Sequence, residues 1–205
     1  MLFRSDRPEV FITAAWGLRK LAVKDTLSGV VAYVKAAKRR LAGMRDFKSS
    51  HLSDALDHQL SQLNQFLGQQ KYAPAAGILR DFIPRPGDRQ PGLPESRAAA
   101  IWALGLIHEG KPDSKLVGAL EGRLNSREIP PEYPQVRRMA AITLGRLKAK
   151  EALPSLRQHF ADGKPSPNPV NNACGWAVEQ LTGEVMPAPE TIRGVQRDWF
   201  LTPDK

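Results

Sequence analysis

Side chains that commonly bind metals are sparse in this 205-residue sequence. His108 and Glu109 are adjacent, and imidazole with carboxylate is a ligand combination that suits iron and other transition metals. A metal centre needs several such groups facing one another, whereas His51, His58 and His159 have no glutamate beside them. We therefore expect no metal site and no other cofactor.

The sequence also gives no indication of nucleophilic chemistry. Its single cysteine, Cys174, lies in the apolar context NNACGWAV, so we expect a small buried residue rather than a nucleophile. One cysteine excludes an intrachain disulfide and a cysteine-rich metal cluster. The sequence contains neither a Gly-x-Ser-x-Gly motif nor a phosphate-binding Gly-x-x-x-x-Gly-Lys-Ser/Thr loop. We expect a protein without enzymatic activity.

Positive charge is the clearest chemical signal, and it is unevenly distributed. The formal net charge is +9, and residues 1–50 alone hold 11 Lys and Arg against 4 Asp and Glu. Residues 101–150 hold 9 against 5, whereas residues 151–205 hold 5 against 7. A basic N-terminal half can meet nucleic-acid phosphates, an anionic lipid surface or an acidic protein, or it can form a solvated face.

One helix-like segment recurs five times along the chain. In VRRMAAITLGRL (Val136–Leu147), a polar start leads to a small centre at Ala140 and Ala141 and to a Leu-Gly-x-Leu end. When the copies are aligned on Ile142, three of the four tryptophans fall on this one position. The residues at this position, which we call the anchors, are Trp16, Gln65, Trp102, Ile142 and Trp176. Successive anchors are 49, 37, 40 and 34 residues apart. Such spacing is typical of stacked helix pairs, and we expect Trp16, Trp102, Ile142 and Trp176 in the repeat core.

Each anchor segment is followed by a turn and a second amphipathic segment. In LSGVVAYVKAAKRRL, apolar residues such as Val30 and Val34 share one helical face, whereas Lys35 and Arg39 point away from it. A lone helix pair cannot cover its own apolar face, so neighbouring pairs must stack. We predict an all-α fold, an α-solenoid of about five antiparallel helix-pair repeats within residues 1–184. The repeats lie near residues 8–48, 51–86, 94–126, 131–162 and 168–184.

The two ends of the chain depart from the repeat. We expect residues 185–205 to form a capping tail in which Trp199 and Phe200 cover the last repeat, with an exposed docking motif as the alternative. MLFRSDRPEV lacks the apolar region of a signal peptide, and no run of 18 apolar residues predicts a membrane span. The abrupt start leads us to expect part of a longer chain. The compartment is therefore open, and it would be cytoplasmic if the chain were complete.

With the copies aligned, the sequence resembles HEAT-repeat proteins, close to the phycobilisome-lyase-type HEAT-like repeats of bacteria. The residues that carry the resemblance are RAAAIWALGLI, VRRMAAITLGRLKAKEALPSLRQ and ACGWAVEQLTGE, over about residues 94–184. The pattern is fainter over residues 8–93, where 49–70 is irregular. Arg137 recurs as Arg97, which predicts a structural role for both. The repeat itself is a structural unit that occurs in scaffolds, lyases and regulators.

The resemblance implies a scaffold or adaptor that binds another protein through a concave face lined by the second helices. The residues expected to contact the partner are cations of those helices, namely Lys35, Arg39, Lys115, Arg123 and Arg157. The same cations could instead bind nucleic-acid backbones without regard to sequence. A further alternative is bilin-lyase-like chromophore binding, with Arg80 and Arg157 on the propionates. The recurrence of this arginine favours instead a salt bridge or hydrogen bond between repeats.

Overall fold

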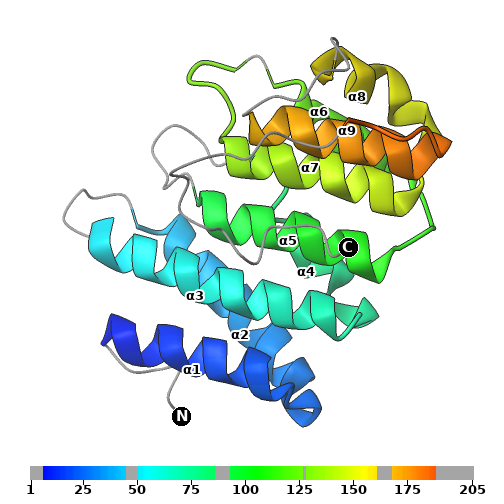
Figure 1. The fold of residues 1–205 in the computed structure, drawn as a ribbon. Coiled ribbons are helices and arrows are strands. Elements are labelled where there is room, and N and C mark those ends of the chain that lie inside the picture. Colours follow the sequence, from blue (N-terminus) through cyan, green and yellow to red (C-terminus); the bar gives the residue numbers. More distant parts are fainter. Residues whose placement is uncertain (1–6, 45–49, 86–92, 127, 161–167, 188–205) are drawn as a thin grey trace. The chain divides into compact units, whose positions relative to one another are not determined.

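The computed structural model describes residues 7–44, 50–85, 93–126, 128–160 and 168–187 (Figure 1). All regular elements in these residues are helices, which confirms the all-α fold class. The α-helices are α1 (Pro8–Leu21), α2 (Leu27–Ala42), α3 (Ser50–Gln69), α4 (Ala76–Arg80), α5 (Pro94–Ile107), α6 (Ser114–Leu124), α7 (Pro134–Leu147), α8 (Leu153–His159) and α9 (Pro169–Thr182). Three short 3-10 helices precede α2, α4 and α8, namely η2 (Lys24–Thr26), η4 (Ala73–Ala75) and η5 (Lys150–Ala152).

The helices alternate as the repeat predicts. Each anchor residue falls in a different first helix, because α1, α3, α5, α7 and α9 contain residues 16, 65, 102, 142 and 176 respectively. The second helices α2, α4, α6 and α8 lie between them in sequence. Within the irregular stretch 49–70, Ser50–Gln69 form helix α3, which is the longest helix in the described part of the chain.

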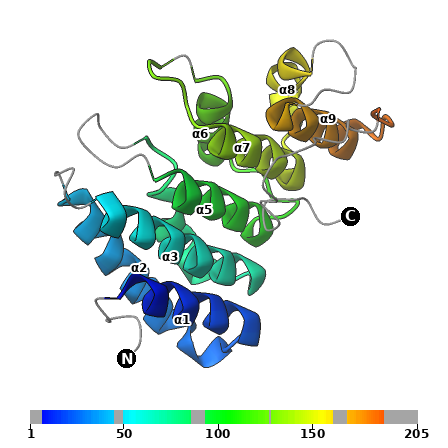
Figure 2. The same cartoon turned by 60° about the vertical axis from the view of Figure 1, so that its left-hand side comes forward.

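The chain divides into two compact units, unit 1 (Met1–Ile107) and unit 2 (His108–Lys205). In unit 1 the first helices α1, α3 and α5 lie side by side, with α3 in the middle (Figures 1 and 2). The second helix α2 packs against α3, and α4 packs against α5. Unit 1 therefore has a layer of first helices and a layer of second helices.

Unit 2 repeats this arrangement with its own helices. The first helices α7 and α9 pack side by side, α6 packs against α7, and α8 packs against α9. The backbone amide of Gly110 donates a hydrogen bond to the carbonyl oxygen of Arg146, which fixes the turn before α6 to the end of α7. Stacked helix pairs of this kind are the building blocks of the predicted α-solenoid.

Neighbouring first helices approach closely at a glycine. A Cβ atom placed on Gly68 of α3 would lie 2.6 Å from Cα and Cβ of Ala103 and 3.3 Å from Cζ3 of Trp102. A Cβ on Gly145 of α7 would lie 3.0 Å from Cα and Cβ of Ala177 and 3.1 Å from Cζ3 of Trp176. The same contact, an anchor Trp and the following Ala against the glycine of the preceding helix, therefore occurs in both units. It gives the Leu-Gly of the repeat a packing role.

Arginines at an equivalent repeat position hold the helix pairs together. In unit 1, Nε and Nη2 of Arg97 donate hydrogen bonds to the carbonyl oxygens of Phe82 and Ile83, at 3.3 and 3.1 Å. In unit 2, Nε of Arg137 donates to the carbonyl oxygen of Leu124 at 3.0 Å. Carbonyl groups at or after a helix end lack intrahelical donors, so these guanidinium groups satisfy them. The structural role predicted from the recurrence is confirmed.

The four residues expected in the repeat core differ in their burial. Trp102 and Ile142 are buried, and Trp176 is partly buried against Gly145. Trp16, in contrast, is 44% exposed, so the expectation of a core position is wrong for this residue. The physical reason is the missing neighbour, because in unit 1 no described helix packs on the outer side of α1.

Polar residues on the buried faces of α3 explain its irregular pattern. Asp57 is buried, and its two carboxylate oxygens accept hydrogen bonds from the backbone amides of Glu95 and Ser96 at 3.1 and 2.9 Å. These amides belong to the first turn of α5, where helical N–H groups lack internal partners. Asn64 of α3 donates to the carbonyl oxygen of Ser96 at 3.0 Å. Helix α3 is thus joined to α5 by hydrogen bonds as well as by apolar contacts.

Candidate interaction surface

Helix α2 orients Lys35 and Arg39 away from the core of unit 1. Its buried face consists of Val30, Val34, Ala37 and Leu41, at helical spacing. The opposite face is exposed and consists of small residues and two cations, namely Ser28, Ala32, Lys35, Ala36 and Arg39. We call these five residues the α2 surface. Because the small side chains project little, the side chains of Lys35 and Arg39 stand above the helix backbone.

The helix that carries this surface is anchored by buried hydrogen bonds. The hydroxyl group of Tyr33 donates to Oε1 of Gln59 at 2.8 Å, and Nε2 of Gln59 donates to the carbonyl oxygen of Phe11 at 3.3 Å. Gln59 is completely buried in α3, so it connects α2 with α1. Burial raises the pKa of Tyr33, while the hydrogen bond with Gln59 and the charge of Arg40 act in the opposite direction. The position of α2 on unit 1 is therefore well defined.

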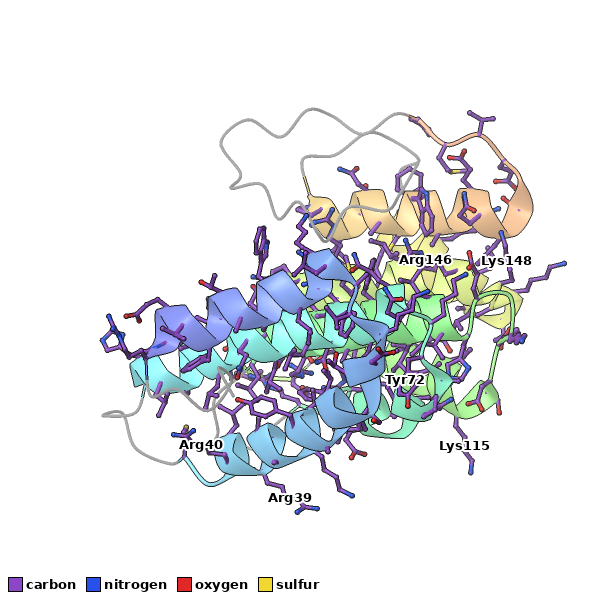
Figure 3. The ribbon with its side chains drawn as sticks, turned by 90° about the horizontal axis from the view of Figure 1, so that it is seen from below. Arg39, Arg40, Tyr72, Lys115, Arg146 and Lys148 are labelled. Carbon is purple, nitrogen blue, oxygen red and sulfur yellow. The ribbon has the colours of Figure 1, made fainter. Side chains whose placement is uncertain are left out.

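All charged side chains of α2 are positive. The helix contains Lys35, Lys38, Arg39 and Arg40 and no acidic residue. Nζ of Lys38 lies 5.4 Å from the ring centroid of Phe82, whereas Lys35 and Arg39 form no ion pair with the described residues. Figure 3 shows Arg39 and Arg40 extending away from the ribbon. Cations in the last turn also interact favourably with the helix dipole, which is their structural contribution.

In unit 2, the predicted cation Lys115 lies in the first turn of α6 and is exposed. The carboxylate of Asp113 caps this turn by accepting a hydrogen bond from the backbone amide of Leu116 at 2.8 Å. Helix α6 also exposes small residues, Gly118, Ala119 and Gly122. Exposed small residues beside a cation are therefore common to the second helices α2 and α6.

The other two predicted cations are engaged within unit 2. Arg123 forms ion pairs of 3.2 Å with Glu128 and with Glu132, whose side chain is fully buried. Nη2 of Arg157 lies 2.8 and 2.9 Å from the carboxylate oxygens of Glu184. Arg123 thus joins α6 to the segment before α7, and Arg157 joins α8 to the end of α9. Contact of these two residues with a partner remains a prediction.

The remaining sequence predictions concern the cysteine, a metal site, a membrane span and the C-terminal cap. Cys174 is fully buried, and burial raises the pKa of its thiol to about 12. In the described part of the chain, no group of three or more His, Cys, Asp or Glu side chains is arranged to hold a metal ion. No helix among the described residues is long and apolar enough to cross a membrane. Trp199 and Phe200, the predicted cap, lie outside the described residues.

The sequence did not predict the ion-pair partners of Arg123 and Arg157 or the polar residues at the interface between α3 and α5. Glu132 and Glu184 do not recur at a repeat position, so the alignment of repeats gave no signal for them. The capping of α5 by Asp57 joins residues 38 and 39 positions apart, which no local pattern indicates. The spacing of Ser53, Asp57 and Ser61 at four-residue intervals is a signal that could have suggested a continuous polar stripe.

Comparison with known proteins agrees with the architecture. A family model described as HEAT repeats matches residues 90–178, which contain α5 to α8, most of α9 and three of the five anchors. Searches of curated proteins and of solved structures gave no match. The family match shows that residues 90–178 are HEAT repeats, and the alternating helices and the glycine contact that recurs in both units extend the same helix-pair architecture to unit 1.

Proposed function

We propose that the protein is a non-enzymatic adaptor that binds an acidic segment of another protein through the α2 surface. HEAT repeats generally mediate contacts between proteins and are generally non-catalytic. Stacked helix pairs offer an extended rigid surface for this purpose. The proposal assigns the contact to the layer of second helices, where the sequence places the repeat cations.

The observation that carries the proposal is that Lys35 and Arg39 form no ion pair with any residue that the structure describes. Both lie on the exposed face of α2, Lys35 in the middle of the helix and Arg39 in its last turn, with small residues around them and no acidic residue on the helix. Surface cations that form no internal ion pair are available for charge-assisted hydrogen bonds with carboxylates. Ser28, Ala32 and Ala36 allow a partner chain to approach the helix closely. Lys115 on α6 provides a similar cation in unit 2.

Arg123 and Arg157 have a smaller part in this proposal than Lys35 and Arg39. A partner carboxylate would have to displace Glu132 from Arg123, which would leave a buried carboxylate without its cation. Arg157 would have to exchange Glu184 for the new carboxylate, so it gains little. The same competition applies to a bilin propionate, so the chromophore-binding alternative loses its best-placed arginine.

Binding to nucleic-acid backbones is the main alternative. Phosphate binding by several Lys and Arg side chains produces a steep loss of affinity as salt is raised. The α2 surface favours a protein, because only two of its five residues are cations. No aromatic side chain belongs to it that could stack on a base.

The proposal is tested by affinity capture from extracts of the native cells, with three versions of the purified protein. The wild type is compared with Lys35→Glu/Arg39→Glu and with the matched control Lys111→Glu/Lys150→Glu. The control makes the same change in net charge at two exposed lysines of unit 2. The proposal predicts that one acidic protein is captured by the wild type and by the control, and not by the α2 variant. Capture that is equal for all three versions would contradict it.

A duplex of about 20 base pairs, titrated at low and at moderate salt, tests the alternative. Tight binding at low salt that Lys35→Glu/Arg39→Glu abolishes would replace the acidic protein with nucleic acid as the partner. Weak binding that both double variants reduce equally reflects net charge alone and leaves the proposal standing.

A further inference from the structure

The outer face of α1 combines an exposed aromatic side chain, Trp16, with open space over Gly17, a position that we call the recess. Residues of this face recur at helical spacing opposite the buried stripe of Phe11, Ala15 and Arg19, namely Glu9, Thr13, Trp16, Gly17 and Lys20. Trp16 is 44% exposed, and a Cβ atom placed on Gly17 would have no neighbour within 4 Å. Figure 2 shows α1 at one side of the layer that it forms with α3 and α5 in unit 1.

Within each unit, an anchor Trp of this repeat packs against a glycine of a neighbouring first helix. Trp102 lies against Gly68, and Trp176 lies against Gly145. Trp16 occupies the same repeat position without such a neighbour among the described residues of unit 1. Burial of the apolar surface of the Trp16 ring would be favourable. The next residue of α1 is a glycine, Gly17.

We propose that two copies of this chain associate through their α1 outer faces, with Trp16 of each copy packed on Gly17 of the other. A twofold interface requires that one patch complement itself, and this face provides both the side chain that protrudes and the recess. Leu21 and Val23 are also exposed at the end of α1 and the following turn, and they extend the apolar area. The inference does not depend on the function proposed for the α2 surface.

The charges of α1 select the antiparallel orientation of the two helices. Glu9 lies in the first turn and Lys20 in the last turn, and Lys24 follows in η2. Parallel helices would place Lys20 beside its own copy, whereas antiparallel helices bring Glu9 towards the lysine-bearing end of the other copy. Antiparallel helices also align their dipoles favourably. The contact involves one helix per copy, so we expect a dissociation constant in the range of about 10 to 100 µM.

The test is sedimentation equilibrium of the full chain from about 5 to 500 µM, which brackets the expected dissociation constant. Trp16→Ala removes the protruding ring. Gly17→Gln fills the recess with a side chain that favours helix and meets no atom within the monomer, so it should fold normally. The matched control is Gly29→Gln, because Gly29 of α2 likewise has nothing within 4 Å of its Cβ position and lies outside this face.

The expected result is a dimer for the wild type and for Gly29→Gln, with the dissociation constant of both α1 variants raised at least about tenfold. Circular dichroism at low concentration establishes that the variants are folded. A wild-type chain that stays monomeric over the whole range would overturn the proposal. So would a dimer that persists with unchanged affinity in Trp16→Ala and Gly17→Gln, because its interface would lie elsewhere.

Discussion

Replacing Gly68 with alanine tests the packing of α3 against α5, the contact on which the fold of unit 1 depends. The new Cβ would lie 2.6 Å from Cα and Cβ of Ala103. Carbon atoms pack at about 3.5 to 4.0 Å, so the contact is about 1 Å too short. Since one of the two atoms is backbone, a change of side-chain rotamer cannot relieve the clash. Helix α5 would have to move away from α3, and Trp102 would lose part of its contact.

The expected magnitude follows from two opposing contributions. Overpacking of a core by one group costs about 1 to 3 kcal/mol, and the rigid position of Ala103 favours the upper half of this range. The higher helix propensity of alanine offsets about 1 kcal/mol of this cost. The net loss is about 1 to 2 kcal/mol, which corresponds to a melting temperature lower by about 2 to 8 °C for a chain of this size.

The assay is thermal and urea unfolding followed by circular dichroism, with Gly29→Ala as the control in the same unit. A Cβ on Gly29 meets no atom within 4 Å, so this variant should be more stable than the wild type by up to about 1 kcal/mol. The two Gly→Ala changes are thus expected to have opposite signs. If Gly68→Ala were as stable as Gly29→Ala, the close approach of α3 and α5 would be refuted.

Three further predictions concern single side chains. Arg97→Met should destabilise the protein by about 2 to 4 kcal/mol, because it leaves the buried carbonyl groups of Phe82 and Ile83 without the guanidinium donor. Arg39→Met is the control at an exposed arginine. Equal urea midpoints for the two variants would contradict the role given to Arg97. Cys174, whose thiol has a pKa of about 12, should react with a thiol reagent at pH 8 at least about 1,000 times more slowly in the native than in the urea-unfolded protein. Fast labelling of the native protein would show that the buried face of α9 is accessible to solvent. Burial raises the pKa of Asp57 in the folded state, with hydrogen bonds from Ser96 and Glu95 opposing the shift, so the folded protein binds this proton more tightly than the unfolded chain does. The contribution of Asp57 to stability is therefore greatest below its unfolded pKa of about 3.9 and is lost as the pH rises through the folded pKa. The unfolding free energy of the wild type relative to that of Asp57→Asn should accordingly fall between pH 4 and pH 7. A rise over this range would mean that the hydrogen bonds from the α5 amides outweigh burial.

The repeat architecture could be predicted because its signal is local and recurs. A small centre followed by Leu-Gly marks a first helix wherever it occurs, and the structure gives the glycine a physical meaning in Gly68 and Gly145. The recurrence of Arg97 and Arg137 was informative for the same reason. Both residues satisfy carbonyl groups at or just after the end of the preceding second helix.

What could not be predicted depends on neighbours that the local pattern does not contain. Trp16 has the residue type of a core anchor, yet its burial requires a glycine-bearing helix on its outer side. The pairing of Arg157 with Glu184 depends on where α9 ends relative to α8. Gln59 and Asp57 interrupt the apolar pattern of α3 because their partners come from α1, α2 and α5. These polar groups are satisfied only in the folded state.

The equilibrium dissociation constant of the captured partner tests the central claim about the α2 surface most directly. Isothermal titration of this partner should give an affinity at least about tenfold weaker for Lys35→Glu/Arg39→Glu than for the wild type, since two charge-assisted contacts become repulsive. The control Lys111→Glu/Lys150→Glu should remain within about twofold of the wild type. Equal affinities for both double variants would contradict the assignment of binding to α2.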